Sequence, residues 1–455
     1  MTDEIGHDKH IIDAHPTKEL FISILVRDIT IRDAIGDLLD NSVDGALRLR
    51  PDGSYDGLWV KIELDAQNDR FIIDDNCGGI PVDVARNYAF RFGRPENAEA
   101  IKHSVGVFGI GMKRALFRLG KVFTVESVAH NSSFRMEVKV DDWKRDPENW
   151  SFRFQNFEED HPEYPDEELG TKVTVTNLLP DVKDTFERKL EITRLIEELQ
   201  REHLYSIDQG LRITVNDALL EAPELKLLVF DNLKTAYWES TEGPVKVQIY
   251  AGISESEKHG TSGGWYIFCN KRLVLGPDQT SVTGWGAREP ARIPEYHSQF
   301  YRFRGYVFLD ADDPLNLPWN TAKTGMDLDS PVYRAVLQKM IVLMRSVIDF
   351  LDQLHREDQD SAKGKIKETP SKDAIYHASL VTLNEVSQNP AYRSPENFVA
   401  PDRARPARPL VEQTTIRYAV PKWKYDLAQK YFDADKPSDV GLGTFDYFFD
   451  REIEE

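Results

Sequence analysis

Cysteine is scarce in this sequence: it occurs only as Cys77 and Cys269, which are far apart and exclude a disulfide framework or a zinc site of paired cysteines. Long apolar runs are missing too, since the longest early one, from Leu20 to Val26, is interrupted by Ser23 and is too short to cross a bilayer. The first residues are acidic and lack the apolar stretch of a secretory signal. We therefore expect a cytoplasmic protein of a reducing compartment that does not enter a membrane.

Positive charge is also under-represented. The 455 residues include 57 Lys and Arg against 77 Asp and Glu, which gives a net charge of −20 at pH 7. Such a chain does not coat DNA or an anionic membrane non-specifically, so nucleic acid could bind only at a local basic patch. With 40% hydrophobic and 11% aromatic residues the composition is that of a globular protein, which excludes a disordered or fibrous chain.

The length predicts about three domains, and the residue patterns divide the chain into four segments. Residues 1–180 alternate helical and strand-like stretches, which is typical of antiparallel strands with helices on one face, an α+β sandwich. Residues 181–355 mix strands and helices as a second α+β domain. Residues 356–410 are polar and rich in proline, as in a linker or an extended arm. Residues 411–455 regain a pattern and are expected to form a small C-terminal module.

Periodicity locates the main elements. We expect helices at 31–50, 185–204 and 422–432, a further helix from Pro331 onward, a mobile loop at 85–105, and strands at 58–64, 71–75, 122–128, 134–140, 151–154, 171–178, 245–250, 265–275, 306–309 and 416–420. The helix from Pro331 has apolar residues at heptad-like spacing: Val336, Met340, Leu343, Val347, Phe350 and Leu354. They indicate either a helix packed in the core or a seam for a second chain.

The predicted helix 31–50 has an unusual polar side. Its apolar residues fall on one side, whereas Asp33, Asp37, Asp40 and Asp44 line the other together with Asn41. Each such pair of like charges costs the helix roughly a few tenths of a kcal/mol, and Asp is a poor helix former. A solvated acidic face is one interpretation. The other is a cation held near Asp37 and Asn41, because oxygen ligands suit Mg²⁺ that bridges to phosphates.

A second pattern places an acid at the end of a strand. Asp75 follows an apolar strand and precedes Gly78 and Gly79. The carboxylate could face a ligand amine, with glycine backbone approaching the ligand closely. An ordinary turn is the alternative.

A third pattern is a glycine-rich loop. Gly106, Gly109 and Gly111 precede a helix-forming stretch that contains Lys113, an arrangement that can cradle phosphate. The spacing matches neither the dinucleotide fingerprint nor the Walker A motif. The fourth pattern is the pair Gly170-Thr171 at the start of a predicted strand, which by itself indicates no function.

Taken in order, these four patterns resemble the motifs of the GHKL superfamily, which includes gyrase-type topoisomerases, heat-shock chaperones, histidine kinases and MutL. The superfamily's motifs match Asp37, Asn41 and Asp44 (an acid, then Asn and Asp four and seven residues on), 75–79 (D-x-G-x-G), 106–111 (G-x-x-G-x-G) and Gly170-Thr171. The resemblance covers residues 15–180 and implies a Bergerat-type ATP-binding domain.

The resemblance also implies a role for each matching residue. Asn41 would bind Mg²⁺, and Asp37 would be the general base for the attacking water. Asp75 would accept a hydrogen bond from the adenine amine, helped by Thr171. The remaining cofactor-binding residues would be Gly79 beside the adenine, Asp44 in the first motif, and Gly106, Gly109, Gly111 and Lys113 around the phosphates.

The sequence departs from the superfamily pattern at two positions. Hydrolysing members usually carry Glu where this chain has Asp37, whose side chain is about 1.5 Å shorter. Hydrolysis is therefore expected to be slow. Cys77 replaces the first glycine of the second motif, whereas Gly79 keeps the second.

Residues 181–355 resemble, more weakly, the transducer domain of MutL, gyrase-type and MORC proteins. In those proteins a loop brings Lys or Gln to the γ-phosphate, and here the loop 316–325 offers Lys323 as a second catalytic residue. A solvated loop lysine is the alternative. No pair of helices with a phospho-acceptor His precedes the ATPase segment, which disfavours a histidine kinase.

These observations together predict an ATPase that binds ATP and Mg²⁺ and closes as a clamp, forming a homodimer when ATP binds. The resemblance to MORC and MutL implies a role in DNA transactions or in defence against foreign DNA. Two other functions stay open: an ATP-sensing scaffold with little hydrolysis that recruits a separate effector protein, and a chaperone-like ATPase.

Overall fold

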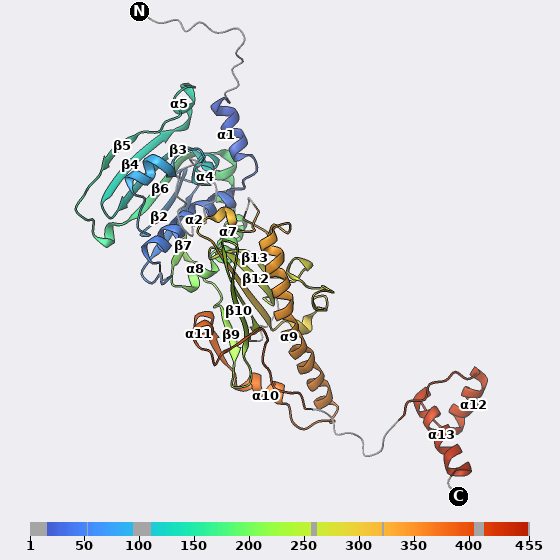
Figure 1. Cartoon of the computed structure of the whole chain (residues 1–455). Coiled ribbons are helices and arrows are strands. Elements are labelled where there is room, and N and C mark those ends of the chain that lie inside the picture. The colour runs from blue at the N-terminus through green and yellow to red at the C-terminus, as the bar shows by residue number, and fades with distance from the viewer. Residues whose placement is uncertain are drawn as a thin grey trace, which may run out of the picture. The chain divides into compact units, whose positions relative to one another are not determined.

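Figure 1 shows the chain as a computed structural model, which describes residues 16–51, 53–93, 111–255, 262–320, 323–404 and 414–453. Contacts divide the chain into two compact units, Met1–Ala404 and Arg405–Glu455, and each is described by itself. The first unit contains two large sheets with helices packed on them, so the fold class is α+β, as the sequence predicts. Within the described ranges, no helix is long and apolar enough to cross a membrane.

The first sheet has eight strands in the order β5-β4-β3-β6-β2-β1-β7-β8. The strands are β1 (Trp59–Asp65), β2 (Arg70–Asp75), β3 (Gly120–Ala129), β4 (Ser132–Lys139), β5 (Phe154–Glu158), β6 (Gly170–Leu178), β7 (Arg212–Val215) and β8 (Ala218–Leu219). Neighbouring strands are antiparallel except β1 and β7, which are parallel. The pairing of β2 with β6 sets Asp75 opposite Thr171 and so joins two of the motifs.

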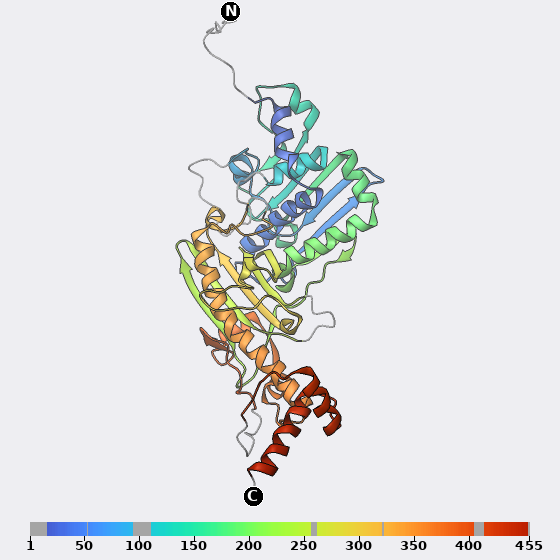
Figure 2. The same ribbon diagram turned by 90° about the vertical axis from the view of Figure 1, so that its right-hand side faces the viewer.

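Helices cover this sheet and close the first core. They are α1 (Lys18–Arg27), α2 (Ile31–Leu49), α3 (Val82–Val84), α4 (Gly111–Leu119), α5 (Val140–Arg145), α6 (Pro180–Glu187), α7 (Lys189–Glu202) and α8 (Leu204–Asp208). Alternate residues of β1, such as Val60 and Ile62, share a core with Ile35 and Leu39 of α2. Figure 2 shows α2 and α7 lying over the strands of this sheet. The apolar side of α2 therefore fixes the orientation of its polar side.

The second sheet has six strands in the order β13-β12-β14-β11-β10-β16 and is buried on both faces. The strands are β10 (Thr235–Glu242), β11 (Val245–Ile253), β12 (Gly264–Cys269), β13 (Arg272–Asp278), β14 (Phe303–Asp310) and β16 (Arg393–Pro395). One face packs against α9 (Pro331–Ala362). The other packs against a small sheet of β9 (Lys226–Val229) and β15 (Ser379–Thr382) and against α11 (Leu383–Gln388).

Helix α9 begins where the sequence predicts. Ser330 is its N-cap and accepts a hydrogen bond from the Tyr333 N–H, and Pro331 is its first residue. The apolar residues at heptad-like spacing from Val336 to Phe350 are buried in the core beneath the second sheet. The core-packing interpretation is therefore confirmed, and these side chains do not form a seam for a second chain.

Several segments differ from the expectation. Strands β7 and β8 lie beyond residue 180 yet complete the first sheet, because β7 pairs with β1. The segment expected as a linker or arm contains the end of α9, α10 (Pro370–His377), β15, α11 and β16, and β16 pairs with β10. The strand expected at 151–154 begins only at Phe154, and residues 85–89, expected in a loop, form a π-helical turn. Residues 94–105 of that loop lie outside the described residues.

The second unit is a pair of helices, α12 (Lys422–Phe432) and α13 (Pro437–Glu452). Phe432 packs against Tyr447, and Val440 is the buried residue of α13. The helix expected at 422–432 is confirmed. The strand expected at 416–420 is not formed, and the closing aromatic residues are helical.

Candidate functional site

The first motif lies on α2, whose start is set by its own sequence. Thr30 Oγ1 accepts a hydrogen bond from the Asp33 N–H at 3.1 Å, and the Asp33 carboxylate accepts one from the Thr30 N–H at 3.0 Å, which forms a capping box. Further along the helix, Asp37, Asp40 and Asp44 are all buried. The interpretation of these three acids as a solvated face is therefore wrong, and their charges must be met by partners inside the protein.

Two cations hold the carboxylate of Asp37. Arg114, on α4, donates from Nε to Oδ2 at 2.9 Å and places Nη2 2.7 Å from the same oxygen. Lys323, which follows β14 in the chain, donates from Nζ to Oδ1 at 3.2 Å. Helix α4 starts directly beside this carboxylate, because a Cβ added at Gly111 would lie 3.4 Å from Asp37 Cγ. The two residues proposed as catalytic are thus in direct contact.

Asp40 lies one turn along the helix and connects the two halves of the unit. Lys323 Nζ donates to its Oδ2 at 2.8 Å, and Arg272 of β13 pairs with its Oδ1. Arg272 also donates from Nη2 to Glu202 Oε2 at 2.9 Å, at the end of α7. His203 Nε2 lies 3.8 Å from Asp40 Oδ1. The result is a buried charge cluster drawn from α2, α7, β13 and the loop of Lys323.

Burial and pairing shift the pKa values of this cluster in different directions. Burial disfavours the Asp40 carboxylate, but Arg272, Lys323 and His203 outweigh it and hold the pKa of Asp40 well below its usual value. Burial raises the pKa of Glu202 to about 7, against the opposing effect of Arg272. Burial also lowers the pKa of His203 to about 3, so its ring is neutral near pH 7. Asp40 is therefore the ionised acid that holds both cations.

A second buried carboxylate lies at the end of β2. Asp75 Oδ2 accepts a hydrogen bond from Ser42 Oγ at 2.7 Å, and its Oδ1 accepts from the N–H groups of Cys77 at 2.9 Å and Thr171 at 3.3 Å. Burial raises the pKa of Asp75 to about 6, although these three hydrogen bonds act against the rise. Thr171 Oγ1 is itself 2.9 Å from Ser127 Oγ. The structure thus brings Asp75 and Thr171 together, as the motifs predict.

Two close backbone approaches around the second motif, to β3 and to α2, require glycine. Gly79 has φ +68°, and a Cβ there would lie 2.0 Å from the carbonyl oxygen of Val128. Gly45 of α2 approaches the same segment, since its Cβ would lie 2.5 Å from the Cys77 carbonyl oxygen. The absence of a side chain at Gly45 lets the first and second motifs lie against each other, and its absence at Gly79 lets the second motif lie against β3.

The remaining predicted residues lie at different depths. Asn41 is half-buried, and its Nδ2 donates to the Asp37 carbonyl at 2.8 Å. Lys113 points into the core, where its Nζ donates to the Ala89 carbonyl at 2.7 Å and burial lowers its pKa to about 7. Gly106 and Gly109 lie outside the described residues.

The sequence patterns do not indicate several residues of the site. Ser42, Arg114, Glu202 and His203 belong to none of the predicted roles, and Arg272 lies inside the stretch 265–275 that is expected only as a strand. Arg114 directly follows the glycine loop and Lys113, and Ser42 lies within the first motif, so position beside a motif was the available signal. The partners of Arg272 are 70 and 232 residues away in the chain, and no local pattern indicates them.

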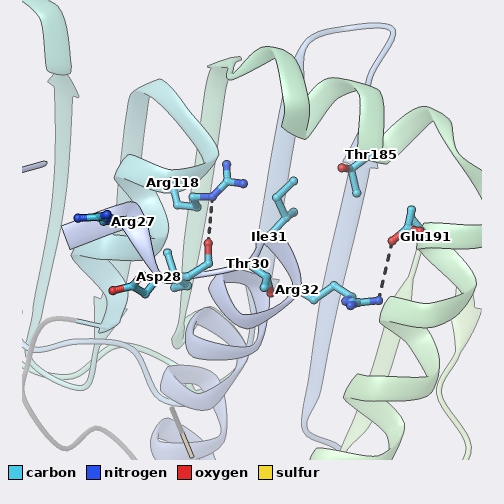
Figure 3. A pocket seen from close by; sticks show the side chains of 9 residues that line it. Arg27, Asp28, Thr30, Ile31, Arg32, Arg118, Thr185 and Glu191 are labelled. Carbon is cyan, nitrogen blue, oxygen red and sulfur yellow. Dashed lines mark hydrogen bonds and ion pairs between the residues drawn. The ribbon is translucent and has the colours of Figure 1, made fainter. Parts of the chain in front are cut away.

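A separate hollow lies at the start of α2 and is shown in Figure 3. It is lined by Arg27, Asp28, Ile29, Thr30, Ile31, Arg32, Arg118, Thr185 and Glu191. Arg118 donates to the Ile29 carbonyl at 3.2 Å, and Arg32 pairs with Glu191 at 3.8 Å. No motif residue lines this hollow, so it is distinct from the charge cluster.

Comparison with known families decides what the motif arrangement is. Residues 29–167 match the family model described as "Histidine kinase-, DNA gyrase B-, and HSP90-like ATPase". The matched range begins just before α2 and includes the buried acids of α2, Asp75 at the end of β2, and the strands β1 to β5. This chain carries a GHKL-type ATPase domain. No curated protein gives a significant match to the chain.

Asp75 and Asn41 of this GHKL domain are the described residues that could contact ATP and Mg²⁺. A carboxylate has about four acceptor positions, and the protein uses three of those of Asp75, which leaves one for a ligand amine. Within the ranges described above, no group of three or more His, Cys, Asp or Glu could hold a metal ion by itself. A cation beside Asn41 would therefore need further oxygens, which is how Mg²⁺ binds together with substrate phosphates.

Proposed function

We propose that the GHKL domain hydrolyses Mg-ATP and that the second half of the unit responds to the γ-phosphate through Lys323. The observation that carries the proposal is the contact of Lys323 with Asp37 and Asp40, two acids of the nucleotide-binding helix α2. Lys323 is 8% exposed, so it is not a solvated loop lysine. A phosphate would compete with two carboxylates for this one ammonium group.

In the proposed reaction Asp37 accepts a proton from water. The water oxygen bonds to the γ-phosphorus, the bond from that phosphorus to the bridging oxygen breaks, and ADP and phosphate leave. Lys323 would stabilise the charge on the transferring group. Asn41 would hold Mg²⁺, which would neutralise phosphate charge when bound. Asp75 and Thr171 would orient the adenine through the remaining acceptor position of Asp75, with Gly79 beside the ring.

The charge cluster also suggests how hydrolysis would be coupled to a change in the relative position of the two halves of the unit. Lys323 and Arg272 belong to the second half of the unit, whereas Asp37 and Asp40 belong to the GHKL domain. Movement of Lys323 from carboxylate to phosphate would change the contact between these halves, a two-state switch driven by differential binding. We extend the proposal to an ATP-dependent clamp that dimerises, as GHKL domains commonly do. Its setting, DNA transactions or defence against foreign DNA, rests on the weaker MORC and MutL resemblance.

A second candidate function is an ATP-sensing scaffold that hydrolyses little and recruits an effector protein. Asp37 favours it, because it is shorter than the usual Glu and both of its oxygens are held by cations. In this case ATP would displace Lys323 without rapid turnover.

Single-turnover hydrolysis with purified protein separates the two functions. Under the ATPase proposal, Asp37→Asn should still bind Mg-ATP but lose about 10²–10⁴-fold in rate, the usual contribution of a general base. Asp33→Asn is the matched control, since it changes the same helix one turn earlier and does not touch the charge cluster. Equal rates for wild type and Asp37→Asn would reject Asp37 as the base, and no turnover by wild type would favour the scaffold.

A further inference from the structure

Arg114 is a charged residue of the site to which the motifs assign no role. It lies in the first turn of α4 beside Lys113, but the two side chains have different destinations. Lys113 donates to the Ala89 carbonyl in the core, whereas Arg114 reaches Asp37 on α2. The Arg114 side chain is 24% exposed and that of Asp37 is 6% exposed. A partly solvated guanidinium thus holds a buried carboxylate.

Each carboxylate oxygen of Asp37 accepts hydrogen bonds from a different kind of cation, a guanidinium or an ammonium group. Arg114 places Nε and Nη2 on Oδ2, at 2.9 and 2.7 Å, whereas Lys323 donates to Oδ1. A guanidinium is planar and rigid, so two of its donors on one oxygen fix the direction of the carboxylate. An ammonium has no such plane and can move to another oxygen.

This division matters because the carboxylate torsion of Asp is soft. The last side-chain torsion of Asp has broad minima, so an unanchored carboxylate turns readily. Packing adds one restraint, since Gly111 brings the start of α4 within 3.4 Å of the group. The directional hold comes from Arg114, one turn along the same helix.

On the basis of the proposed hydrolysis, we infer that Arg114 is a positioning residue for Asp37. It holds Oδ2 and thereby fixes Oδ1 as the atom that accepts the proton of the attacking water after Lys323 has moved. Arg114 acts through Asp37 and does not itself bind the nucleotide. A base that is misplaced by about 1 Å can cost about 10²-fold in rate.

The first test compares Arg114→Met with two other variants in the full chain. Arg114→Met should lower kcat by about 10- to 100-fold while the KM for ATP and the affinity for ADP change by less than about threefold. Arg114→Lys keeps the charge but not the fork and should recover only part of the rate. Arg118→Met is the matched control, because Arg118 lies one turn further on α4 and pairs with Asp181 at 2.7 Å instead of Asp37. It should hydrolyse like wild type.

The second test needs no catalysis. Thermal unfolding of the protein without nucleotide is measured for wild type, Arg114→Met, Asp37→Asn and the double variant. Because the two side chains contact each other, Arg114→Met should lower the unfolding midpoint less in the Asp37→Asn protein than in wild type. The same cycle with Arg118→Met should be additive.

The outcomes distinguish this inference from the proposed function. A large loss of ADP affinity in Arg114→Met would overturn the inference, because it would make Arg114 a nucleotide ligand. Wild-type kcat in Arg114→Met, or additive unfolding midpoints for Arg114 and Asp37, would also overturn it while leaving the ATPase intact. A wild type that binds ATP without turnover would overturn the hydrolysis itself, and with it the positioning role, even if the two residues are coupled in unfolding.

Discussion

At the scale of single residues, the site is built from carboxylates that have been taken out of water. Asp75, the acid proposed to contact adenine, shows what this does to a carboxylate. Its pKa of about 6 lies above the ordinary value because burial disfavours the charge more than the hydrogen bonds of Ser42, Cys77 and Thr171 favour it. The group is therefore mostly an acceptor-only carboxylate above pH 6 and carries a proton below it.

ATP affinity should consequently depend on pH through Asp75. In the proposed contact the ionised Asp75 is the acceptor for the adenine amine, so the apparent ATP affinity should fall as pH drops below about 6 and be about tenfold weaker at pH 5 than at pH 7.5. Calorimetric titration at both pH values measures this. Asp75→Asn should bind about tenfold more weakly at pH 7.5, since an amide places a donor where an acceptor is needed.

The phosphates of ATP titrate in the same range, and the Asp75→Asn protein is the control for that effect. Phosphate titration acts on both proteins equally, whereas the part due to Asp75 should be missing from the variant. Identical pH dependence in the two proteins would reject Asp75 as the group that contacts adenine.

Site residues could be predicted from the sequence where their spacing along one helix or at the end of a strand matches a motif. Asp37, Asn41 and Asp44 share one side of a helix, and Asp75 and Thr171 lie at strand ends that the motifs mark. Spacing in the sequence predicts which side chains of one helix or strand lie together. It could not predict the contact of Asp40 with Arg272, which is 232 residues away in the chain. Lys113 is a second example, because the motif predicts a phosphate contact for it but does not indicate that its ammonium donates to the Ala89 carbonyl.

At the scale of elements, long helices with a regular apolar side are well determined by sequence. α9 has a Ser cap, Pro at its first position and a continuous apolar side, and all three features agree. The short strands β7, β8 and β16 have two to four residues, too few to show a period, and they form because longer neighbours offer an edge. Two prolines of the segment expected to be a linker, Pro370 and Pro395, stand at the start of α10 and the end of β16.

The burial of α9 predicts how two neighbouring substitutions differ. Leu343 is fully buried against the second sheet, so Leu343→Ala should lower the free energy of unfolding by about 2–5 kcal/mol. Val342, the preceding residue, is 39% exposed, and Val342→Ala should change the free energy of unfolding by less than about 0.5 kcal/mol. Urea unfolding measures both. A loss of dimer mass in Leu343→Ala without loss of stability would instead support a seam for a second chain.

At the scale of the whole first unit, the two sheets are joined by charge as well as by apolar packing. Asp40 accepts from Arg272 and Lys323 of the second half, and Glu202 of α7 completes the cluster. Buried ion pairs contribute little net stability but strongly penalise loss of one partner. Such a cluster therefore favours one relative position of the halves and makes that position sensitive to a competing anion, a property that no single motif contains.

Replacement of Lys323 tests this coupling. Lys323→Ala should lower kcat by about 10²-fold, because a donor to the transferring phosphate is lost, yet hardly weaken ADP binding, because ADP has no γ-phosphate. It should also reduce the ATP-induced change in scattering radius or mass. The variant should fold, because Asp37 keeps Arg114 and Asp40 keeps Arg272 as partners. Lys271→Ala is the matched control, since it removes a different lysine–aspartate pair of the second half, Lys271 with Asp310 at 2.7 Å. If Lys323→Ala and Lys271→Ala hydrolyse and close alike, Lys323 serves only as a structural partner of α2; equal losses of ATP and ADP binding would point to a folding defect.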